Sequence, residues 1–264
     1  MSVEAPARSF AIDVGNTRIK FGVFEPLAGE ALPVCRSAGF VPCGDPFPPR
    51  LAEEFRAAPG LRALLSGSNP PEMDRIVRDW PGDWPPLFVL RDRTRLPLTI
   101  DVDFPDRVGP DRLLNAVAAQ RLRAAGQRAV IVDCGTATTV DYVDESGAFR
   151  GGAILPGIGM SARALHRYTA VLPLIPAPDV TASVPDVIGR NTEAAMRSGL
   201  FWGCLGGVRE LVRQMLSRSP SPALVLITGG AGGALVPFLD QAQAYPHLPL
   251  QGLVLSSDRL AGAE

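Results

Sequence analysis

Hydrophobic and polar residues alternate near the start of the chain in a pattern that predicts a β-hairpin. A short apolar strand is expected at 10–14, a turn at Gly15-Asn16, and a second strand at 17–25. One face of this hairpin is apolar, so we expect it to pack against helices. That face carries Ile12, Val14, Ile19, Phe21 and Val23.

Polar side chains gather on the opposite face of the same hairpin. If the turn has two residues, Asp13 lies across the ladder from Arg18, and Ala11 lies across from Lys20. Lys20 is the only lysine in the chain. The hairpin therefore separates a polar side from an apolar side.

A second copy of this design occurs about half a chain length later. An apolar strand at 129–132 runs into Asp133-Cys134-Gly135-Thr136, and another strand follows at 138–143. Such a repeat indicates two related subdomains, which we place at 1–113 and 114–264.

The remaining pattern predicts an α/β protein. Apolar residues recur at spacings of three and four over 110–125, where Pro110 suits the first helical position and Gly126 the stop. Further helices are expected at 50–58, 71–79, 191–217 and 234–242, and further strands at 63–67, 87–91 and 223–227.

Composition narrows the possible partners. The chain has 26 basic and 27 acidic residues, so attraction to polyanions is weak and no nucleic-acid partner is expected. There is no run of 18 apolar residues, and no charged segment followed by an apolar one at the start. We therefore expect no membrane association and no export. The four cysteines show no metal-ligand spacing, and a reducing cytoplasm is the expected location.

Candidate chemistry begins at the first hairpin turn. Gly15 allows backbone N–H groups to approach a phosphate closely, and a carboxylate beside bound phosphates needs a cation between them. We therefore expect Asp13 to hold a hydrated Mg²⁺, with Asn16, Thr17 and Lys20 near phosphate oxygens. An ordinary hairpin turn accounts equally well for this segment taken alone.

The second copy favours the phosphate interpretation, because two such turns can hold a polyphosphate. A third glycine-rich turn at Thr228-Gly229-Gly230 suits contact with a nucleotide, although a flexible loop is the alternative. Walker-type and protein-kinase motifs are absent. The chain at this point resembles the acetate and sugar kinase, heat-shock chaperone and actin superfamily. That resemblance implies two ribonuclease-H-like (actin-like) subdomains with an ATP cleft between them.

Several segments taken together give a closer resemblance. They are Asp13-Val14-Gly15-Asn16-Thr17, Val108-Gly109-Pro110-Asp111-Arg112, Asn115-Ala116-Val117-Ala118-Ala119, Asp133-Cys134-Gly135-Thr136-Ala137-Thr138, Gly151-Gly152-Ala153-Ile154-Leu155-Pro156-Gly157, Ile188-Gly189-Arg190-Asn191-Thr192 and Thr228-Gly229-Gly230. In this order they resemble type III pantothenate kinases, and jointly they are highly specific. The resemblance implies ATP-dependent phosphorylation of pantothenate to 4'-phosphopantothenate, the first step of coenzyme A biosynthesis.

The same resemblance assigns the acceptor site. Asp111 matches the catalytic base, which accepts the proton of the pantothenate hydroxyl. Gly109, Pro110 and Arg112 match substrate-binding positions beside it, and Thr192 matches a pantothenate contact. Phe104 stands where the family commonly has a tyrosine lining the pantothenate site, so a hydroxyl contact is expected to be missing.

The nucleotide side follows in the same way. Asp133 matches the residue that binds a monovalent cation, K⁺ or NH₄⁺, and Thr136 matches an ATP contact. The resemblance also implies a homodimer, with the helix at 191–217 as a candidate interface. The residues expected to bind ATP or its phosphates are Asp13, Val14, Gly15, Asn16, Thr17, Arg18, Ile19, Lys20, Thr136, Thr228, Gly229 and Gly230.

Several of these residues also suit ordinary structural roles. Asp111 would stabilise the first turn of a helix, Arg112 would suit a solvated surface, and Thr192 would suit a helix N-cap. A non-enzymatic transcriptional accessory role, or a sugar kinase of the same superfamily, is the alternative function.

Overall fold

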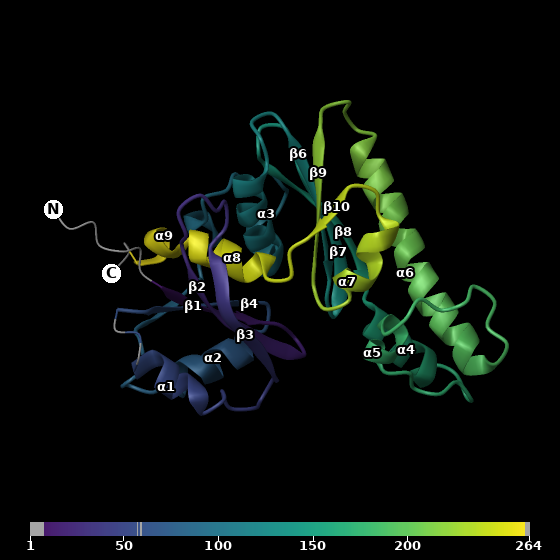
Figure 1. Cartoon of the computed structure of the whole chain (residues 1–264), viewed down its shortest axis with the longest axis horizontal. Helices are drawn as coiled ribbons and strands as arrows, with labels where there is room; N and C mark the ends of the chain where they lie inside the picture. Colours follow the sequence, from purple (N-terminus) through teal and green to yellow (C-terminus); the bar gives the residue numbers. More distant parts are fainter. Residues whose placement is uncertain (1–7, 57, 59, 262–264) are drawn as a thin grey trace. The chain divides into compact units, whose positions relative to one another are not determined.

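The computed structural model describes residues 8–56, 58 and 60–261 and divides into two compact units (Figure 1). The first unit comprises the described residues up to Thr99, the segment Asp103–Leu122, and the described residues from His247 onward. The second comprises Ile100–Val102 and Arg123–Pro246. Each unit is built around its own mixed sheet.

The sheet of the first unit has the order β3-β2-β1-β4-β5. Its first strand is central, pairing antiparallel with β2 and parallel with β4. The strands are β1 (Ser9–Val14), β2 (Arg18–Glu25), β3 (Val34–Pro42), β4 (Arg62–Gly67) and β5 (Leu87–Val89).

Helices pack on this sheet. The predicted apolar hairpin face is confirmed: it forms one buried cluster with Leu51 and Phe55 of α1 (Arg50–Arg56) and with Met73 and Ile76 of α2 (Pro70–Arg78). Two other helices, α3 (Pro110–Leu122) and α8 (Leu248–Leu255), pack on each other, and α8 also contacts β1 and β2. The short elements are η1 (Arg93–Arg95), η2 (Pro105–Arg107) and α9 (Ser257–Ala261).

The second unit repeats the first. Its sheet has the order β10-β9-β6-β7-β8, in which β6 is central, pairs antiparallel with β7 and parallel with β9. The strands are β6 (Arg128–Cys134), β7 (Ala137–Val143), β8 (Phe149–Pro156), β9 (Ala223–Thr228) and β10 (Ala242–Ala244). Written from the other edge, this order is β8-β7-β6-β9-β10, which corresponds strand by strand to β3-β2-β1-β4-β5. The predicted duplication is confirmed, because the two sheets share strand order and strand direction, as two ribonuclease-H-like units do.

The core of the second unit forms beneath its longest described helix, α6 (Thr192–Leu216). Buried α6 residues such as Leu200 and Val208 pack with Val130 of β6 and Val140 of β7. The other helical elements are α4 (Ile158–Arg167), α5 (Ala177–Thr181), α7 (Gly232–Leu235) and η3 (Val236–Phe238).

The division between units differs from the single boundary expected at residue 113. All of α3 belongs to the first unit, and the C-terminal helices return to that unit. The physical reason is close packing of α3 on α8: a Cβ at Gly252 of α8 would lie 2.0 Å from the carbonyl oxygen of Leu114. A helix packed along its length is not divided between two cores.

The hairpin register also differs from the prediction. Val14 pairs with Ile19 and Asp13 with Lys20, so four residues, 15–18, separate the two residues of the last β1–β2 pair. The N–H of Gly15 donates to the carbonyl of Arg18 at 3.0 Å, which closes a wider turn than Gly15-Asn16 alone. Because the shift is two residues, every side chain keeps its predicted face.

The helix expected at 234–242 is wrong. The chain forms the four-residue α7, then η3, and then β10. Pro237 explains the break, because proline lacks the N–H that an α-helix needs in its interior.

Among the described residues, no helix combines the length and apolar character needed to cross a membrane.

Candidate active site

The tip of the β1–β2 hairpin presents polar groups to solvent. Asn16, Thr17 and Arg18 are exposed, whereas Val14 and Ile19 are fully buried in the core of the first unit. Val14 and Ile19 therefore offer only main-chain atoms to a ligand. Side-chain contact at this tip is restricted to the exposed residues and to groups on the Asp13 face.

Asp13 lies at the end of β1 and is 5% exposed. The prediction that Arg18 lies opposite Asp13 is wrong. The register partner is Lys20, and Lys20 Nζ lies 4.0 Å from Asp13 Oδ2. The guanidinium of Arg18 instead lies over the ring of Phe40, 5.0 Å from its centroid. Because the loop is wider than predicted, Lys20, and not Arg18, lies beside the Asp13 carboxylate.

Two residues that sequence reasoning missed hold the hairpin tip. The carbonyl of Gly15 accepts hydrogen bonds from Cys43 Sγ at 3.3 Å and Asn69 Nδ2 at 3.5 Å. Cys43 also donates its N–H to the carbonyl of Thr17 at 3.2 Å, and Asn69 is the N-cap of α2. The Asn69-Pro70 pair is a helix-start signal in the sequence, but nothing local links it or Cys43 to the hairpin.

The second hairpin is built on β6 and β7. Asp133 is half-buried and lies opposite Thr139, and the N–H of Gly135 donates to the carbonyl of Ala137 at 3.1 Å. This turn is one residue shorter than the first, because Cys134 pairs with Thr138 whereas Val14 pairs with Ile19. The two hairpins are therefore related but not identical.

The half-buried Thr136 of this turn is held by the residue that directly follows β8. The N–H of Gly157 donates to the carbonyl of Thr136 at 3.2 Å, and a Cβ at position 157 would lie 2.5 Å from that same oxygen. The close approach explains the glycine that ends the Gly151–Gly157 segment. That segment thus acts on the second hairpin.

The turn after β9 lies against Asp133. Thr228 is the register partner of Asp133, and a Cβ at Gly229 would lie 2.5 Å from Asp133 Oδ1. Gly229 also has φ +87°, a conformation that favours glycine. The structure therefore brings Asp133, Thr228 and Gly229 together, with exposed Gly230 following them. The helix that follows this turn, α7, has only four residues.

Asp111 lies in the first turn of α3 after buried Pro110. Its Oδ1 accepts a hydrogen bond from the N–H of Arg112 at 3.0 Å, and both residues are half-buried. A Cβ at Gly109 would lie only 2.5 Å from that oxygen. Glycine at 109 therefore leaves the space that the carboxylate occupies.

Phe104 and Thr192 are both on the surface. Phe104 is 58% exposed, and the guanidinium of Arg107 lies over its ring at 4.7 Å. Thr192 is the exposed first residue of α6, but the N-cap is Asn191, whose side chain accepts from the N–H of Ala194 at 2.8 Å. The alternative role of Thr192 as an N-cap is wrong.

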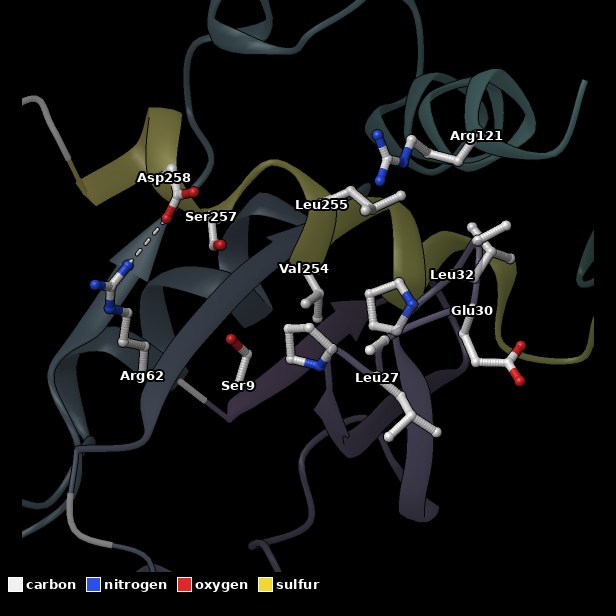
Figure 2. Close-up of a pocket in the computed structure, with 14 residues that line it drawn as sticks. Ser9, Leu27, Glu30, Leu32, Arg62, Arg121, Val254, Leu255, Ser257 and Asp258 are labelled. Atoms are coloured by element: carbon white, nitrogen blue, oxygen red, sulfur yellow. Dashed lines mark hydrogen bonds and ion pairs between the residues drawn. The ribbon is translucent and has the colours of Figure 1, made fainter. Parts of the chain in front are cut away.

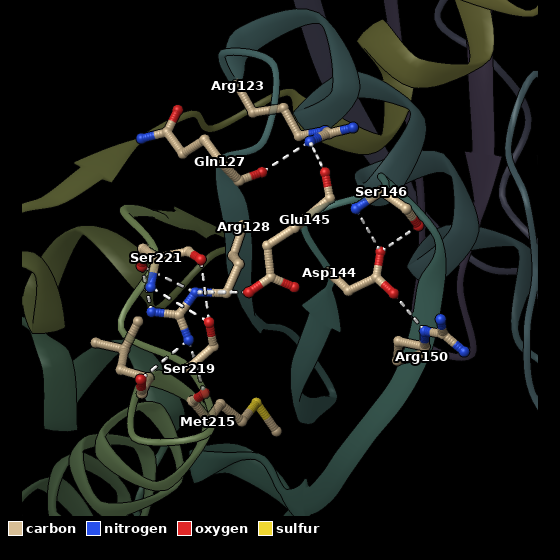
Figure 3. Close-up of polar contacts among 11 residues, drawn as sticks. Arg123, Gln127, Arg128, Asp144, Glu145, Ser146, Arg150, Met215, Ser219 and Ser221 are labelled. Carbon is tan, nitrogen blue, oxygen red and sulfur yellow. Dashed lines mark hydrogen bonds and ion pairs between the residues drawn. The ribbon is translucent and has the colours of Figure 1, made fainter.

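A buried arginine anchors the opposite end of β6 (Figure 3). Arg128 is 3% exposed and donates to the carbonyls of Ser221 and Leu216, each at 3.0 Å. These bonds tie the start of β6 to the C-terminal end of α6 and to the loop before β9. The strand that ends at Asp133 is thereby fixed at its beginning.

A cavity of about 550 Å³ lies in the first unit at the start of β1 (Figure 2). Its lining includes Ser9, Arg121 and the ion pair of Arg62 with Asp258 at 3.3 Å. It contains none of the predicted site residues. Ser9 is four positions from Asp13 along β1, or roughly 13 Å, so this cavity lies away from the phosphate hairpin.

Solved structures share the fold across nearly the whole chain. A Campylobacter jejuni protein assigned to the Baf family of transcriptional activators superposes with a TM-score of 0.58 at 17% identity, covering 96% of this chain and 99% of that one. The activator of 2-hydroxyisocaproyl-CoA dehydratase from Clostridium difficile gives 0.50 at 10% identity, covering 97% and 96%. At such identities the likeness defines the fold alone, which is the actin-like α/β class with two ribonuclease-H-like units.

Sequence comparison defines the family within that class. The type III pantothenate kinase model matches residues 9–214. The type III pantothenate kinase of Cereibacter sphaeroides (strain ATCC 17025) is 43% identical over 178 residues, covering 66% of this chain and 65% of that protein. The one from Gluconobacter oxydans (strain 621H) is 37% identical and covers 95% of this chain and 93% of its own length. The chain belongs to the type III pantothenate kinase family.

Coverage differs among the relatives. The match spans 65% of the length of the Cereibacter relative and 93% of the length of the Gluconobacter relative. The family model nevertheless includes both hairpins and the Gly109–Arg112 segment, because all of them fall within residues 9–214.

Proposed function

We propose that the protein transfers the γ-phosphoryl group of ATP to pantothenate and forms 4'-phosphopantothenate, the first step of coenzyme A biosynthesis. Family membership supports this activity. The observation that carries it is the start of α3, where Gly109 leaves room for the Asp111 carboxylate and the N–H of Arg112 holds one of its oxygens at 3.0 Å. A carboxylate fixed in this way suits a general base.

Asp111 accepts the proton of the primary hydroxyl of pantothenate. As that oxygen forms a bond to the γ-phosphorus, the bond from phosphorus to the leaving oxygen of ADP breaks, and the proton passes to the carboxylate. The position in the first turn of α3 favours the ionised form, because the partial positive charge of a helix N-terminus stabilises an anion. Positioning and electrostatics supply most of the acceleration in such a transfer.

Further residues hold the acceptor. Arg112 offers a guanidinium to the carboxylate of pantothenate, a pairing that can be bidentate. Pro110 fixes the main chain beside the base, and the exposed hydroxyl of Thr192 is a further contact. The exposed ring of Phe104 offers apolar contact without the hydroxyl that a tyrosine would supply.

Both hairpins bind the nucleotide. The tip formed by Gly15, Asn16 and Thr17 contacts the phosphates, together with the side chains of Arg18 and Lys20. Val14 and Ile19 contribute main-chain atoms, since their side chains are buried. The contacts from the second unit come from Thr136, Thr228, Gly229 and Gly230.

The residues around Asp13 fit a hydrated Mg²⁺. Magnesium is commonly held by one or two carboxylates, with waters and substrate phosphates filling the other positions, and Asp13 supplies such a carboxylate at the hairpin. When bound, Mg²⁺ neutralises charge on the phosphates. Lys20 is the protein cation that shares this position, 4.0 Å from the carboxylate.

The residues around Asp133 fit a monovalent cation instead. Its register partners on the two neighbouring strands are the threonines Thr139 and Thr228, in place of a lysine. A carboxylate with hydroxyl groups is an oxygen-rich donor set without a competing ammonium group. We therefore assign K⁺ or NH₄⁺ to Asp133.

A homodimer completes the proposal. Three glycines lie on one side of α6: Gly199, Gly203 and Gly206. Apart from adjacent residues and the nearby backbone of the helix itself, no described atom lies within 4 Å of the place that a Cβ would take, so this side of the helix can be approached closely. Large exposed apolar side chains lie in the segment leading to the same helix: Tyr168, Val171, Leu174, Val184, Val187 and Ile188. Such exposure is typical of a protein interface, and light scattering that reports a monomer would contradict it.

The expected setting is the cytoplasm, without nucleic-acid or membrane partners. With a net charge of −1, the protein has little electrostatic attraction to polyanions such as nucleic acids. A non-enzymatic regulatory role is the weaker alternative, because Asp13, Asp111 and Asp133 are all present in ordered elements.

The proposal is tested by ATP consumption with Mg²⁺ and K⁺ present and with pantothenate, a panel of sugars, or no acceptor added. Turnover that requires pantothenate is the expected result. Turnover with a sugar but not with pantothenate would indicate a sugar kinase. Nucleotide binding without any turnover would indicate the regulatory role.

A further inference from the structure

Among the described residues, two buried hydroxyl groups lack a hydrogen-bond partner. Ser66 is 0% exposed and Thr228 is 2% exposed, yet neither Ser66 Oγ nor Thr228 Oγ1 has one. Burying a hydroxyl without a partner costs free energy, so such groups are rare and call for a physical reason.

Both hydroxyls occupy the same place in the duplicated fold. Ser66 is the register partner of Asp13 across the parallel β1–β4 pair, and Thr228 is the register partner of Asp133 across the parallel β6–β9 pair. Each is followed by a glycine that crowds the strand carrying the aspartate: a Cβ at Gly67 would lie 2.5 Å from the carbonyl of Val14. The same hydroxyl-glycine pair thus adjoins both aspartates.

Ser66 shares a sheet face with the Asp13 carboxylate. On β4, Ala63 and Leu65 share one face of the sheet, and both belong to the buried cluster on the α1 and α2 side. Leu65 and Ser66 point to opposite faces, so Ser66 points to the side of Asp13 and Lys20. The order across the sheet is Lys20, Asp13, Ser66, with neighbouring strands about 4.8 Å apart.

An anion site at the start of α2 does not explain Ser66. The first two helical residues are Pro70 and Pro71, which have no N–H to offer. The N–H of Glu72 already donates to the side chain of Asn69 at 3.4 Å. Across the parallel β1–β4 pair, the register partner of Ser66 on that face is Asp13.

We propose that Ser66 is a positioning residue for Asp13: its O–H donates a hydrogen bond to the carboxylate when Mg²⁺ and ATP are bound, and so fixes the carboxylate towards the hydrated ion. The inference rests on the proposed function, because it concerns the same site. Ser66 holds one side of the carboxylate, and Lys20 lies on the other.

The test compares the Ser66→Ala enzyme with wild type by titration calorimetry, using ATP in the presence of Mg²⁺ and ATP in the presence of EDTA. The Mg²⁺-dependent gain in ATP affinity is expected to fall about tenfold in the variant, the usual scale for losing one hydrogen bond to a charged group. Affinity in EDTA is expected to stay unchanged. The melting temperature of the ligand-free variant is expected to equal or exceed that of wild type, because an unsatisfied buried hydroxyl has been removed.

Ser256→Ala is the matched control. Ser256 is another fully buried serine of the first unit, but its Oγ donates to the carbonyl of Gly252 at 2.9 Å. This variant is expected to melt lower and to keep the full Mg²⁺-dependent gain. If Ser66→Ala fails to fold, Ser66→Cys keeps the size of the side chain with a much weaker donor and is judged by the same criteria.

An unchanged Mg²⁺-dependent gain in the Ser66 variant would overturn the inference, as would an equal loss in the Ser256 control. Suppose that the wild type phosphorylates pantothenate and that Ser66→Ala keeps the full Mg²⁺-dependent gain in ATP affinity. The proposed function would then stand, and only the role of Ser66 would be contradicted. A wild type whose ATP affinity does not respond to Mg²⁺ would contradict the proposed function and the inference together.

Discussion

Lys20 lies directly across the β1–β2 ladder from Asp13, and its Nζ is 4.0 Å from Asp13 Oδ2. The carboxylate is almost fully buried, whereas the lysine side chain is 37% exposed. A buried carboxylate is costly without a nearby positive charge. The only lysine of the chain therefore stands where it can balance Asp13 and still reach towards solvent.

Lys20→Met is expected to lower kcat by roughly 10²- to 10³-fold, the scale for losing one group that stabilises transition-state charge. The KM for pantothenate is expected to change little, because Lys20 lies at the phosphate hairpin. Steady-state kinetics with each substrate varied in turn measure both effects. Lys20→Arg, which keeps the charge, should retain more activity, and unchanged kinetics in Lys20→Met would reduce Lys20 to a surface strand residue.

Asp111→Asn is expected to lower kcat by roughly 10²- to 10⁴-fold, because the amide cannot accept the proton that a general base accepts. The fold and nucleotide affinity are expected to persist, since the two side chains are nearly isosteric. Kinetics combined with ATP titration separate the two effects. Asp106→Asn is the control, because this exposed acid lies a few residues upstream; full activity in Asp111→Asn would show that another group is the base.

Gly109→Ala tests whether the space beside Asp111 matters. The added Cβ would lie 2.5 Å from Asp111 Oδ1, so the carboxylate must move. We expect kcat to fall at least tenfold, with a thermal melting curve close to that of wild type. A matched variant is Gly82→Ala, because a Cβ at that position meets no described atom within 4 Å apart from its two chain neighbours. Equal activities of the two variants would count against a fixed carboxylate.

Asp144 predicts a pH dependence of stability. Burial acts to raise the pKa of Asp144, but hydrogen bonds from Ser146, Arg150 and the N–H of Ala148 outweigh it and lower the pKa to about 2. Because the folded pKa lies below the ordinary value of 3.8, the stabilisation is present above that value and is lost as pH falls towards about 2. Its size is about 2 kcal/mol.

Asp144→Asn is therefore expected to lower the free energy of unfolding at neutral pH by about 2 kcal/mol, with the difference from wild type vanishing near pH 2. Denaturant unfolding across this pH range measures it. Asp101→Asn is the control, because Asp101 is the exposed second partner of Arg150 and should contribute little. A difference that persists at the acidic end would contradict the role given to the Asp144 charge.

The sequence predicted the parts of the fold that local patterns specify. Alternating residues identified β1 and β2, and an apolar strand followed by a second acidic turn identified β6, β7 and the duplication. The hairpin register was missed, because Gly15-Asn16 is a signal for a two-residue turn while the bond from Gly15 to Arg18 closes a longer one. The return of α8 to the first unit was missed because it depends on packing between segments far apart in the chain.

The candidate site was predictable to the same extent. Asp13, Asp111 and Asp133 stand in contiguous motifs, so the sequence alone singled them out. Ser66 lies on β4 and Cys43 lies in the turn after β3, and Ser66 becomes the register partner of Asp13 only through the parallel β1–β4 pairing. No local pattern encodes that pairing.

The most direct test of the central claim is analysis of the product by mass spectrometry and ³¹P NMR after incubation with ATP, Mg²⁺, K⁺ and pantothenate. The account predicts one phosphomonoester on the primary hydroxyl of pantothenate for each ADP released, in wild type and not in Asp111→Asn. ADP release without phosphorylated pantothenate, or equal product from the Asp111→Asn enzyme, would contradict it.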